Sequence, residues 1–114
     1  MTPSSLTQCY SSDIKGSNGF FFTESNTKLT FFLWYPDLVK LYFSDSKIVV
    51  EHSSGTLIIK GDHLFPIAED IAKEKLMKVK MSLPIEEQMA QNARSVYVTE
   101  IIWIGELNDQ EEPT

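Results

Sequence analysis

The residues from 28 to 61 constrain the fold more than any other part of this 114-residue chain. They form short runs in which apolar and aromatic side chains fall on both faces of an extended strand, because strand side chains alternate with a period of two. The first run has two largely apolar faces, which are Leu29, Phe31, Leu33 and Tyr35 on one side and Thr30, Phe32 and Trp34 on the other. Such a strand needs cover on both sides, so the sequence predicts a packed β-sheet.

Two further runs, 47–52 and 56–60, are rich in β-branched and aliphatic residues and flank Ser53-Ser54-Gly55. Short apolar runs bounded by turn residues are typical of buried strands rather than helices. A three-residue connection with glycine in the left-handed position suits a type I turn followed by a bulge. The pattern therefore predicts a hairpin in which Gly55 is left-handed.

The segments before this hairpin also predict strands. Residues 20–22 are three phenylalanines that turn near 24–26 into the strand beginning at 28. Pro36 favours a type I turn over 35–38, because proline fixes φ at the second turn position. Residues 38–43 fit both a helix and a strand, and the short connections on either side favour the strand.

One amphipathic helix is predicted over about 66–75, starting at Pro66. Its apolar stripe consists of Ile67, Ala68, Ile71, Ala72 and Leu76. The next strand, about 77–81, places Lys78 and Lys80 outward, as is common at a sheet edge. Residues of about 84–93 predict either a second short helix or an ordered loop.

The last strand, 95–104, contains an acidic residue in an apolar context. If the strand is regular, Glu100 shares a face with Val96, Val98, Ile102 and Ile104 and points into the core. A buried carboxylate of this kind needs a partner and has a raised pKa. A β-bulge or a strand margin at this position is the favoured interpretation.

Together these elements predict an α+β fold, with a largely antiparallel meander sheet of about five or six strands and the helix on one face. Residues 1–18, which include Cys9, predict a flexible arm because they contain few aliphatic side chains. A single domain is expected over 19–105. Four acidic residues fall in the last nine positions, so 106–114 predicts a disordered acidic tail.

Composition excludes several classes of function. The chain has no apolar stretch of the roughly 20 residues that cross a bilayer, and its first residues do not form a signal peptide. One cysteine gives no internal disulfide, so the expected location is the cytoplasm. The formal charge of −6 argues against nucleic-acid binding, because such binding depends on positive charges that neutralise phosphates. Neither a phosphate-binding loop nor a close Cys or His pair is present, so we expect no metal and no cofactor.

Aromatic residues suggest the leading hypothesis, because nine of them fall between positions 20 and 43. A small domain cannot bury every ring, and aromatic side chains are enriched at interfaces. The candidate ligand or interface residues are Phe32, Trp34, Tyr35, Tyr42 and Trp103. Since one helix leaves a sheet face uncovered, we expect a symmetric dimer. The predicted function is a non-enzymatic interaction or ligand-binding domain that also associates with itself and with another protein or a small ligand.

Two alternatives come from other classes of function. His52, His63 and Glu100 are candidate catalytic residues of a small hydrolase or isomerase whose site lies at a subunit boundary. Lys78 and Lys80 are candidate anion contacts, which with a stacking Tyr or Trp would give a weak single-stranded nucleic-acid binder.

Overall fold

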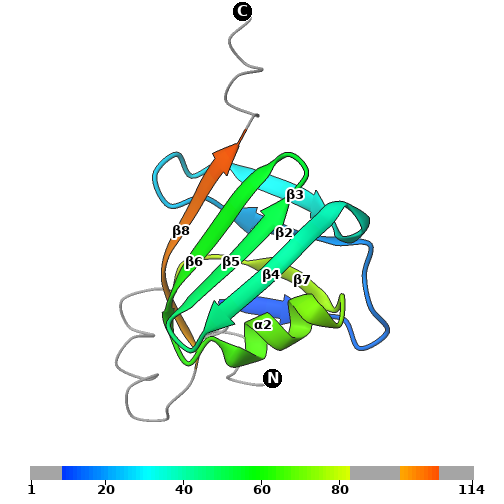
Figure 1. Cartoon of the computed structure of the whole chain (residues 1–114). Coiled ribbons are helices and arrows are strands. Elements are labelled where there is room, and N and C mark those ends of the chain that lie inside the picture. Colours follow the sequence, from blue (N-terminus) through cyan, green and yellow to red (C-terminus); the bar gives the residue numbers. More distant parts are fainter. Residues whose placement is uncertain (1–8, 83–95, 106–114) are drawn as a thin grey trace, which may run out of the picture.

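The computed structural model describes residues 9–82 and 96–105 and confirms the α+β class. Two four-stranded sheets face each other, as Figure 1 shows. The first sheet has the order β1-β7-β2-β3 and the second has the order β4-β5-β6-β8. The strands of the first sheet are β1 (Tyr10–Ser12), β7 (Leu76–Val79), β2 (Gly19–Thr23) and β3 (Thr30–Trp34). The strands of the second are β4 (Leu38–Ser44), β5 (Lys47–His52), β6 (Gly55–Asp62) and β8 (Tyr97–Gly105).

The strands therefore form two sheets rather than the single meander of five or six strands predicted above. The division occurs at Tyr35–Asp37, a 3-10 turn labelled η1, where the chain leaves β3 and enters β4 of the other sheet. Pro36 suits the start of such a turn because its φ is fixed and it needs no hydrogen-bond partner for its nitrogen. The Tyr35 hydroxyl donates to the Leu76 carbonyl oxygen at 2.7 Å, which ties this corner to β7.

The first sheet contains a strand from the expected flexible arm. Tyr10–Ser12 pairs with β7 antiparallel, and Cys9 is only 1% exposed, so the prediction of a loose arm is wrong for these residues. Strand β7 also pairs with β2 in parallel, through Phe21 opposite Lys78. Lys78 thus lies on an interior strand and not on the expected sheet edge.

The second sheet is an antiparallel meander up to β6, and the predicted strand over 38–43 is confirmed as β4. The β5–β6 connection has two residues, Ser53 and Ser54, because His52 pairs with Gly55. Gly55 has a φ of +159°, close to extended, so the predicted left-handed position is wrong. Glycine is needed there for a different reason, since a Cβ would lie 2.6 Å from the Cα of Gly105.

A bulge in β8 confirms the favoured interpretation of Glu100. The register shifts because Lys60 pairs with Glu100 whereas Gly61 pairs with Val98. Val98, Ile101 and Trp103 consequently point inward, and Glu100 points outward. Its carboxylate lies 3.9 Å from the Lys60 ammonium, with both side chains more than 40% exposed.

The other edge of β8 is covered by polar side chains. Three of its backbone N–H groups donate to side-chain oxygens: Val98 to Ser82 Oγ at 2.9 Å, Ile101 to Ser25 Oγ at 2.7 Å and Trp103 to Glu24 Oε2 at 3.3 Å. Unpaired strand edges are sites of unwanted pairing between molecules. These contacts protect this edge and join it to the first sheet.

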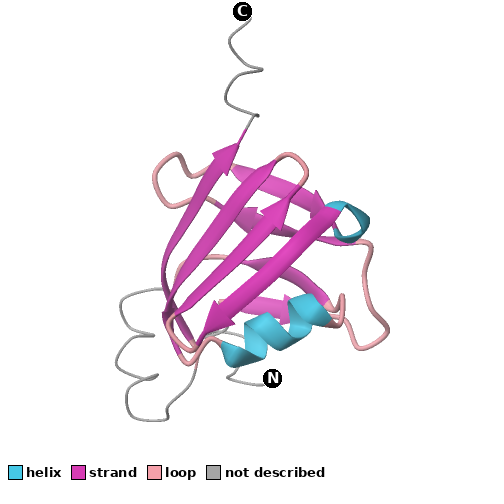
Figure 2. Cartoon of the chain, viewed as in Figure 1, coloured by secondary structure: helices cyan, strands magenta, loops and turns pink. Residues whose placement is uncertain are grey.

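The helix, labelled α2, spans Phe65–Ala72 and ends earlier than the predicted 66–75. Glu74 has a φ of +59°, and the Lys75 N–H donates to the Asp70 carbonyl at 2.7 Å, which is the hydrogen bond of a Schellman ending. Figure 2 shows α2 beside the lower end of the second sheet. It contacts β4 of one sheet and β7 of the other, rather than covering one sheet face.

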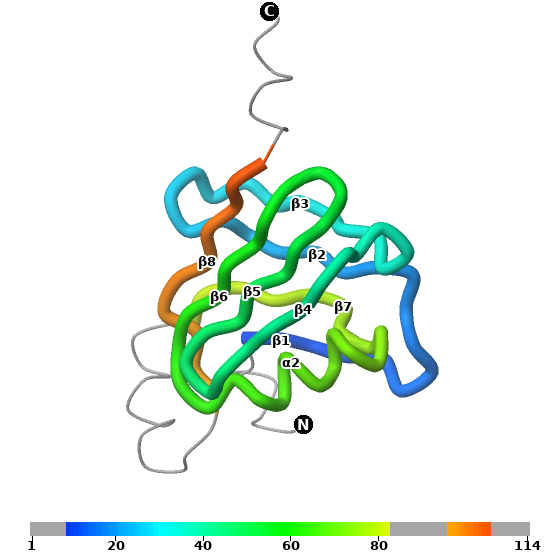
Figure 3. The backbone as a smooth tube through the Cα atoms, viewed as in Figure 1, coloured from blue at the N-terminus to red at the C-terminus, as the bar shows by residue number. Residues whose placement is uncertain are grey.

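One core contains buried side chains from both sheets and from the helix. Figure 3 shows the backbone of the two sheets and α2 that contribute to it. It includes Phe20 and Phe22 from the first sheet, Ile48 and Ile59 from the second, and Ile67 from α2. Each sheet therefore covers the inner face of the other. No helix among the described residues is long and apolar enough to cross a membrane. The expected helix or loop near 84–93 and the expected acidic tail lie outside the described residues.

Candidate functional site

Three aromatic rings lie on the outer face of the first sheet, and we call Phe21, Phe32 and Trp34 the aromatic surface. The strand register places Phe21 opposite Phe32, and their ring centroids are 4.7 Å apart. Phe32 meets Trp34 edge to face at 4.9 Å. Phe21 is 49% exposed and Trp34 is 52% exposed. The rings therefore pack on one another while about half of the outer two remains accessible.

A glycine makes room for this surface. Gly19 pairs with Trp34, and a Cβ at Gly19 would lie 2.7 Å from Cζ of Phe32 and 2.1 Å from the Leu33 carbonyl oxygen. Real Cβ contacts are never that short, so only glycine lets the Phe32 ring lie across β2. Sequence reasoning named Phe32 and Trp34 but missed Phe21. The alternation of Phe20, Phe21 and Phe22 would have placed the middle ring on the opposite face.

Two of the predicted interface residues belong to the core instead. Tyr35 and Trp103 are each 4% exposed. Trp103 is turned inward by the β8 bulge and stacks near Phe22 and Phe31, with centroids at 5.5 and 6.1 Å. Its indole Nε1 is buried and has no hydrogen-bond partner among the described residues. Neither ring can meet a ligand at the surface.

Tyr42 is exposed, but it lies on the outer face of the second sheet and so is separate from the aromatic surface. Its hydroxyl donates to Glu51 Oε2 at 2.5 Å, and the Lys40 ammonium lies 5.6 Å from its ring centroid. The hydrogen bond to Glu51 raises the pKa of Tyr42, and partial desolvation adds to the effect. Tyr42 and Glu51 therefore form one polar unit across β4 and β5.

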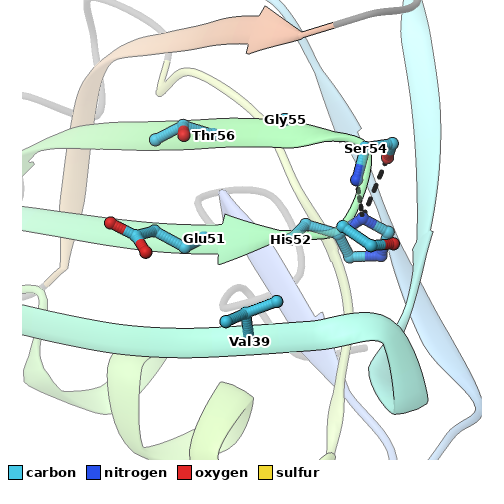
Figure 4. Close-up of a pocket in the computed structure, with 7 residues that line it drawn as sticks. Val39, Glu51, His52, Ser54, Gly55 and Thr56 are labelled. Carbon is cyan, nitrogen blue, oxygen red and sulfur yellow. Dashed lines mark hydrogen bonds between the residues drawn. The ribbon is translucent and has the colours of Figure 1, made fainter.

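A shallow hollow of about 280 Å³ lies at the β5–β6 turn (Figure 4). It is lined by Val39, Glu51, His52, Ser53, Ser54, Gly55 and Thr56. The hollow combines one carboxylate, one imidazole and three hydroxyl groups. It is open to solvent, which favours contact with a side chain of another molecule rather than enclosure of a small ligand.

His52 stabilises this turn. Its Nδ1 accepts the Ser54 backbone N–H at 3.2 Å and lies 2.9 Å from Ser54 Oγ. Its Nε2 lies 3.2 Å from the Trp34 carbonyl oxygen, which can only accept a hydrogen bond. His52 therefore links the hairpin tip to β3 through both of its ring nitrogens.

The three candidate catalytic residues do not meet within one chain. Glu100 pairs with Lys60, five residues along β6 from the partner of His52, which is about 16 Å at 3.3 Å per residue. His63 lies beyond the end of β6, and its Nδ1 is 3.6 Å from Asp45 Oδ2. Within residues 9–82 and 96–105, no group of three or more His, Cys, Asp or Glu side chains could hold a metal ion.

Lys78 and Lys80, the predicted anion contacts, are both exposed. Lys78 is the neighbour of Phe21 across the parallel β2–β7 pair, so it borders the aromatic surface. Lys80 follows β7, and its backbone N–H donates to the Cys9 carbonyl at 2.8 Å. Contact of either lysine with an anion stays a prediction.

The sequence matches no protein-family model, and neither the curated proteins nor the solved structures give a match. What these surfaces can do is therefore inferred from their geometry.

Proposed function

We propose that this chain is a non-enzymatic interaction domain that binds an extended segment of another protein on its aromatic surface. The observation that carries the proposal is the packing of Phe21, Phe32 and Trp34, two of which remain about half exposed. Rings fixed by their neighbours offer a large contact area and lose little conformational entropy on binding. Such rings also dominate the energetics of many protein interfaces.

The position of the surface favours an extended partner. Strand β3 lies at the edge of the first sheet and carries both Phe32 and Trp34, so a segment can lie along this edge. In strand addition, backbone hydrogen bonds provide affinity and alternate side chains provide specificity. The apolar side chains of such a segment would then lie against the two rings.

The test is selection of binding peptides from a displayed library of random 12-residue segments, with the folded chain as bait. Selected peptides are then titrated into the wild-type chain and into Trp34→Ala and Phe32→Ala variants, with affinity measured by calorimetry. We expect micromolar binding, rich in apolar and ring residues, that weakens at least tenfold in each variant.

Tyr42→Ala is the matched control, because it removes an exposed ring from the other sheet. This variant should bind the selected peptides as the wild type does. The proposal is overturned if the library yields no binder, or if the selected peptides bind all four proteins equally well.

A single-stranded nucleic acid is the second candidate ligand, because Lys78 borders Phe21. Ring stacking next to a cation is the usual way of binding single strands. Titration with a 12-residue oligothymidylate at low salt tests it, and binding that neither Lys78→Ala nor added salt weakens would contradict it. The formal charge of −6 makes this candidate weaker than the protein partner.

The enzyme alternative requires another subunit to join His52, His63 and Glu100, which lie apart in one chain. Such a site predicts that one of the two histidines titrates abnormally, and two ordinary titration curves by NMR would exclude it. The sequence also supports a cytoplasmic location, since one cysteine gives no internal disulfide. Self-association concerns a different face of the molecule.

A further inference from the structure

The outer face of the second sheet carries an apolar row that crosses all four strands. The strand register aligns Tyr42, Val49, Ile58 and Ile102, which we call the middle row. Tyr42 is 46% exposed, and the other three side chains are partly exposed. Figure 2 shows this sheet in front, with no other described strand and no described helix crossing it. Contiguous apolar surface of this kind marks interaction sites.

Two mostly polar rows flank the middle row, and each carries lysine and glutamate at different strands. The row nearer the β5–β6 turn consists of Lys40, Glu51, Thr56 and Ile104. The row on the other side consists of Ser44, Lys47, Lys60 and Glu100. In strand β5, therefore, an acidic residue lies on one side of the apolar row and a basic residue lies on the other.

We infer that this face binds a second copy of the chain, with a two-fold axis running along the middle row. This axis places each middle-row residue opposite the same residue of the partner. It places each flanking row opposite the partner's other flanking row. Glu51 then faces the partner's Lys47, and Lys47 faces the partner's Glu51. A self-complementary patch of this kind is what a symmetric dimer requires.

The other two-fold arrangement is unfavourable. An axis parallel to the strands places β5 opposite the partner's β6. It places each flanking row opposite the same row of the partner. It would place Lys47 opposite the partner's Lys60 and Lys60 opposite the partner's Lys47, so two like-charge contacts would form within one flanking row. The charges therefore select the axis along the middle row.

The hollow at the β5–β6 turn gives the partner's Lys47 a place to bind. Glu51 lines this hollow of about 280 Å³, and its carboxylate accepts the Tyr42 hydroxyl through one oxygen. An ionised carboxylate has about four acceptor positions, so it can also accept an ammonium group. The resulting pair is partly shielded by Val39 and Thr56.

The size of the face predicts a weak dimer. Four strands of six to nine residues cover about 19 by 23 Å, or roughly 440 Å² in projection. Standard interfaces bury about 800 Å² per partner. We therefore expect dissociation constants of about 10 to 1,000 micromolar, which requires measurements at high concentration.

The experiment is sedimentation equilibrium of the full chain from 10 micromolar to 2 millimolar. The wild-type mass should rise with concentration toward that of two chains. Ile58→Lys should weaken association at least tenfold, because it buries an unpaired charge in the middle row. Ile14→Lys is the matched control, since Ile14 is 84% exposed and lies in the connection between β1 and β2 of the first sheet, and it should associate as the wild type does.

A charge exchange tests the orientation. Glu51→Lys and Lys47→Glu should each weaken the dimer, and the double variant should restore it to within threefold of the wild type. The two residues are four positions apart on one strand, about 13 Å, so the exchanged charges cannot pair with each other within one chain. A mass of one chain at every concentration, a dimer unaffected by Ile58→Lys, or a double variant without restoration would each overturn the inference. Peptide binding at the aromatic surface is unaffected by these outcomes.

Discussion

Both sheets contribute to one core, but their outer faces differ. The first sheet presents three rings that contact one another beside Gly19, with no carboxylate among its paired neighbours. The second presents an apolar row between two rows that each carry both lysine and glutamate. The inner faces determine that the chain folds, whereas the outer faces differ in what they can bind.

The difference indicates two separate kinds of contact. Rings without a carboxylate among their paired neighbours suit partners of varied sequence, because an aromatic face gives contact area without demanding one polar match. Rows of fixed charges suit a single partner in a single orientation, because wrong pairings bring like charges together. One sheet is therefore suited to a second protein and the other to the chain itself.

The largest expected effect is a difference in the free energy of unfolding between substitutions on the two faces of β2. Phe22 is fully buried against Phe31 and Trp103, so Phe22→Ala should lower the free energy of unfolding by about 3–5 kcal/mol. Phe21→Ala, one residue away, should lower it by about 1 kcal/mol, since it removes one exposed ring contact. Urea denaturation measures both. Equal losses would show that the outer rings belong to the core and are not a binding surface.

The next effect concerns the glycine beneath the aromatic surface. Gly19→Ala should lower the free energy of unfolding by about 1–3 kcal/mol, because the new methyl group overlaps Phe32 and the Leu33 carbonyl. The same variant should change the Trp34 fluorescence spectrum as Phe32 moves. Asn18→Ala, at an exposed neighbouring position, should stay within about 0.5 kcal/mol of the wild type. If Gly19→Ala changed neither the free energy of unfolding nor the fluorescence spectrum, the Phe32 ring would be free to shift.

The corner between the sheets predicts a pH effect. Burial raises the pKa of Tyr35 well above its usual value of 10.0. Above pH 10 the unfolded chain loses a proton that the folded chain keeps, so the free energy of unfolding should fall as pH rises. Tyr35→Phe should make this alkaline slope shallower in urea denaturation between pH 9 and 11.5. Some slope should remain, because the pKa values of Tyr10 and Tyr42 are also raised.

The smallest effect lies on the outer face of the second sheet. The Lys60 and Glu100 side chains are 3.9 Å apart and largely in solvent, so Lys60→Ala should change the free energy of unfolding by no more than about 0.5 kcal/mol. A loss above 2 kcal/mol would mean that this face is more enclosed than the sheet pairing indicates. Thermal unfolding in dilute protein measures the change.

Local patterns in the sequence predicted the local elements. Pro36 indicated a turn, short connections favoured the strand over 38–43, and the position of Glu100 indicated a bulge or a strand margin, of which the structure has the bulge. The division into two sheets was not predictable, because η1 bends the chain by an amount that no turn pattern specifies. β1 was missed since Tyr10–Ser12 has little apolar content and forms only by pairing with β7.

The residues of the candidate surfaces were also predicted only in part, because the face they occupy depends on how the strands pair. Trp34 and Tyr42 are exposed and Phe32 is partly exposed, although they lie on two different sheets. Trp103 was assigned to an interface as one of many aromatic residues in a small domain, but it points into the core together with Val98 and Ile101 once the bulge shifts the register of β8. Pairing between strands determines which face of the sheet a ring occupies, and the sequence of a single strand does not specify that pairing.

The place of β7 between β1 and β2 has a consequence during synthesis on the ribosome. β1 and β2 emerge early, yet the strand that joins them follows more than fifty residues later. Chains are made at about 5–20 residues per second, so the pairing edge of β2, with its three phenylalanines, stays open for several seconds. The first sheet is completed only when β7 emerges, and until then the open edge of β2 makes the nascent chain prone to pair with other molecules.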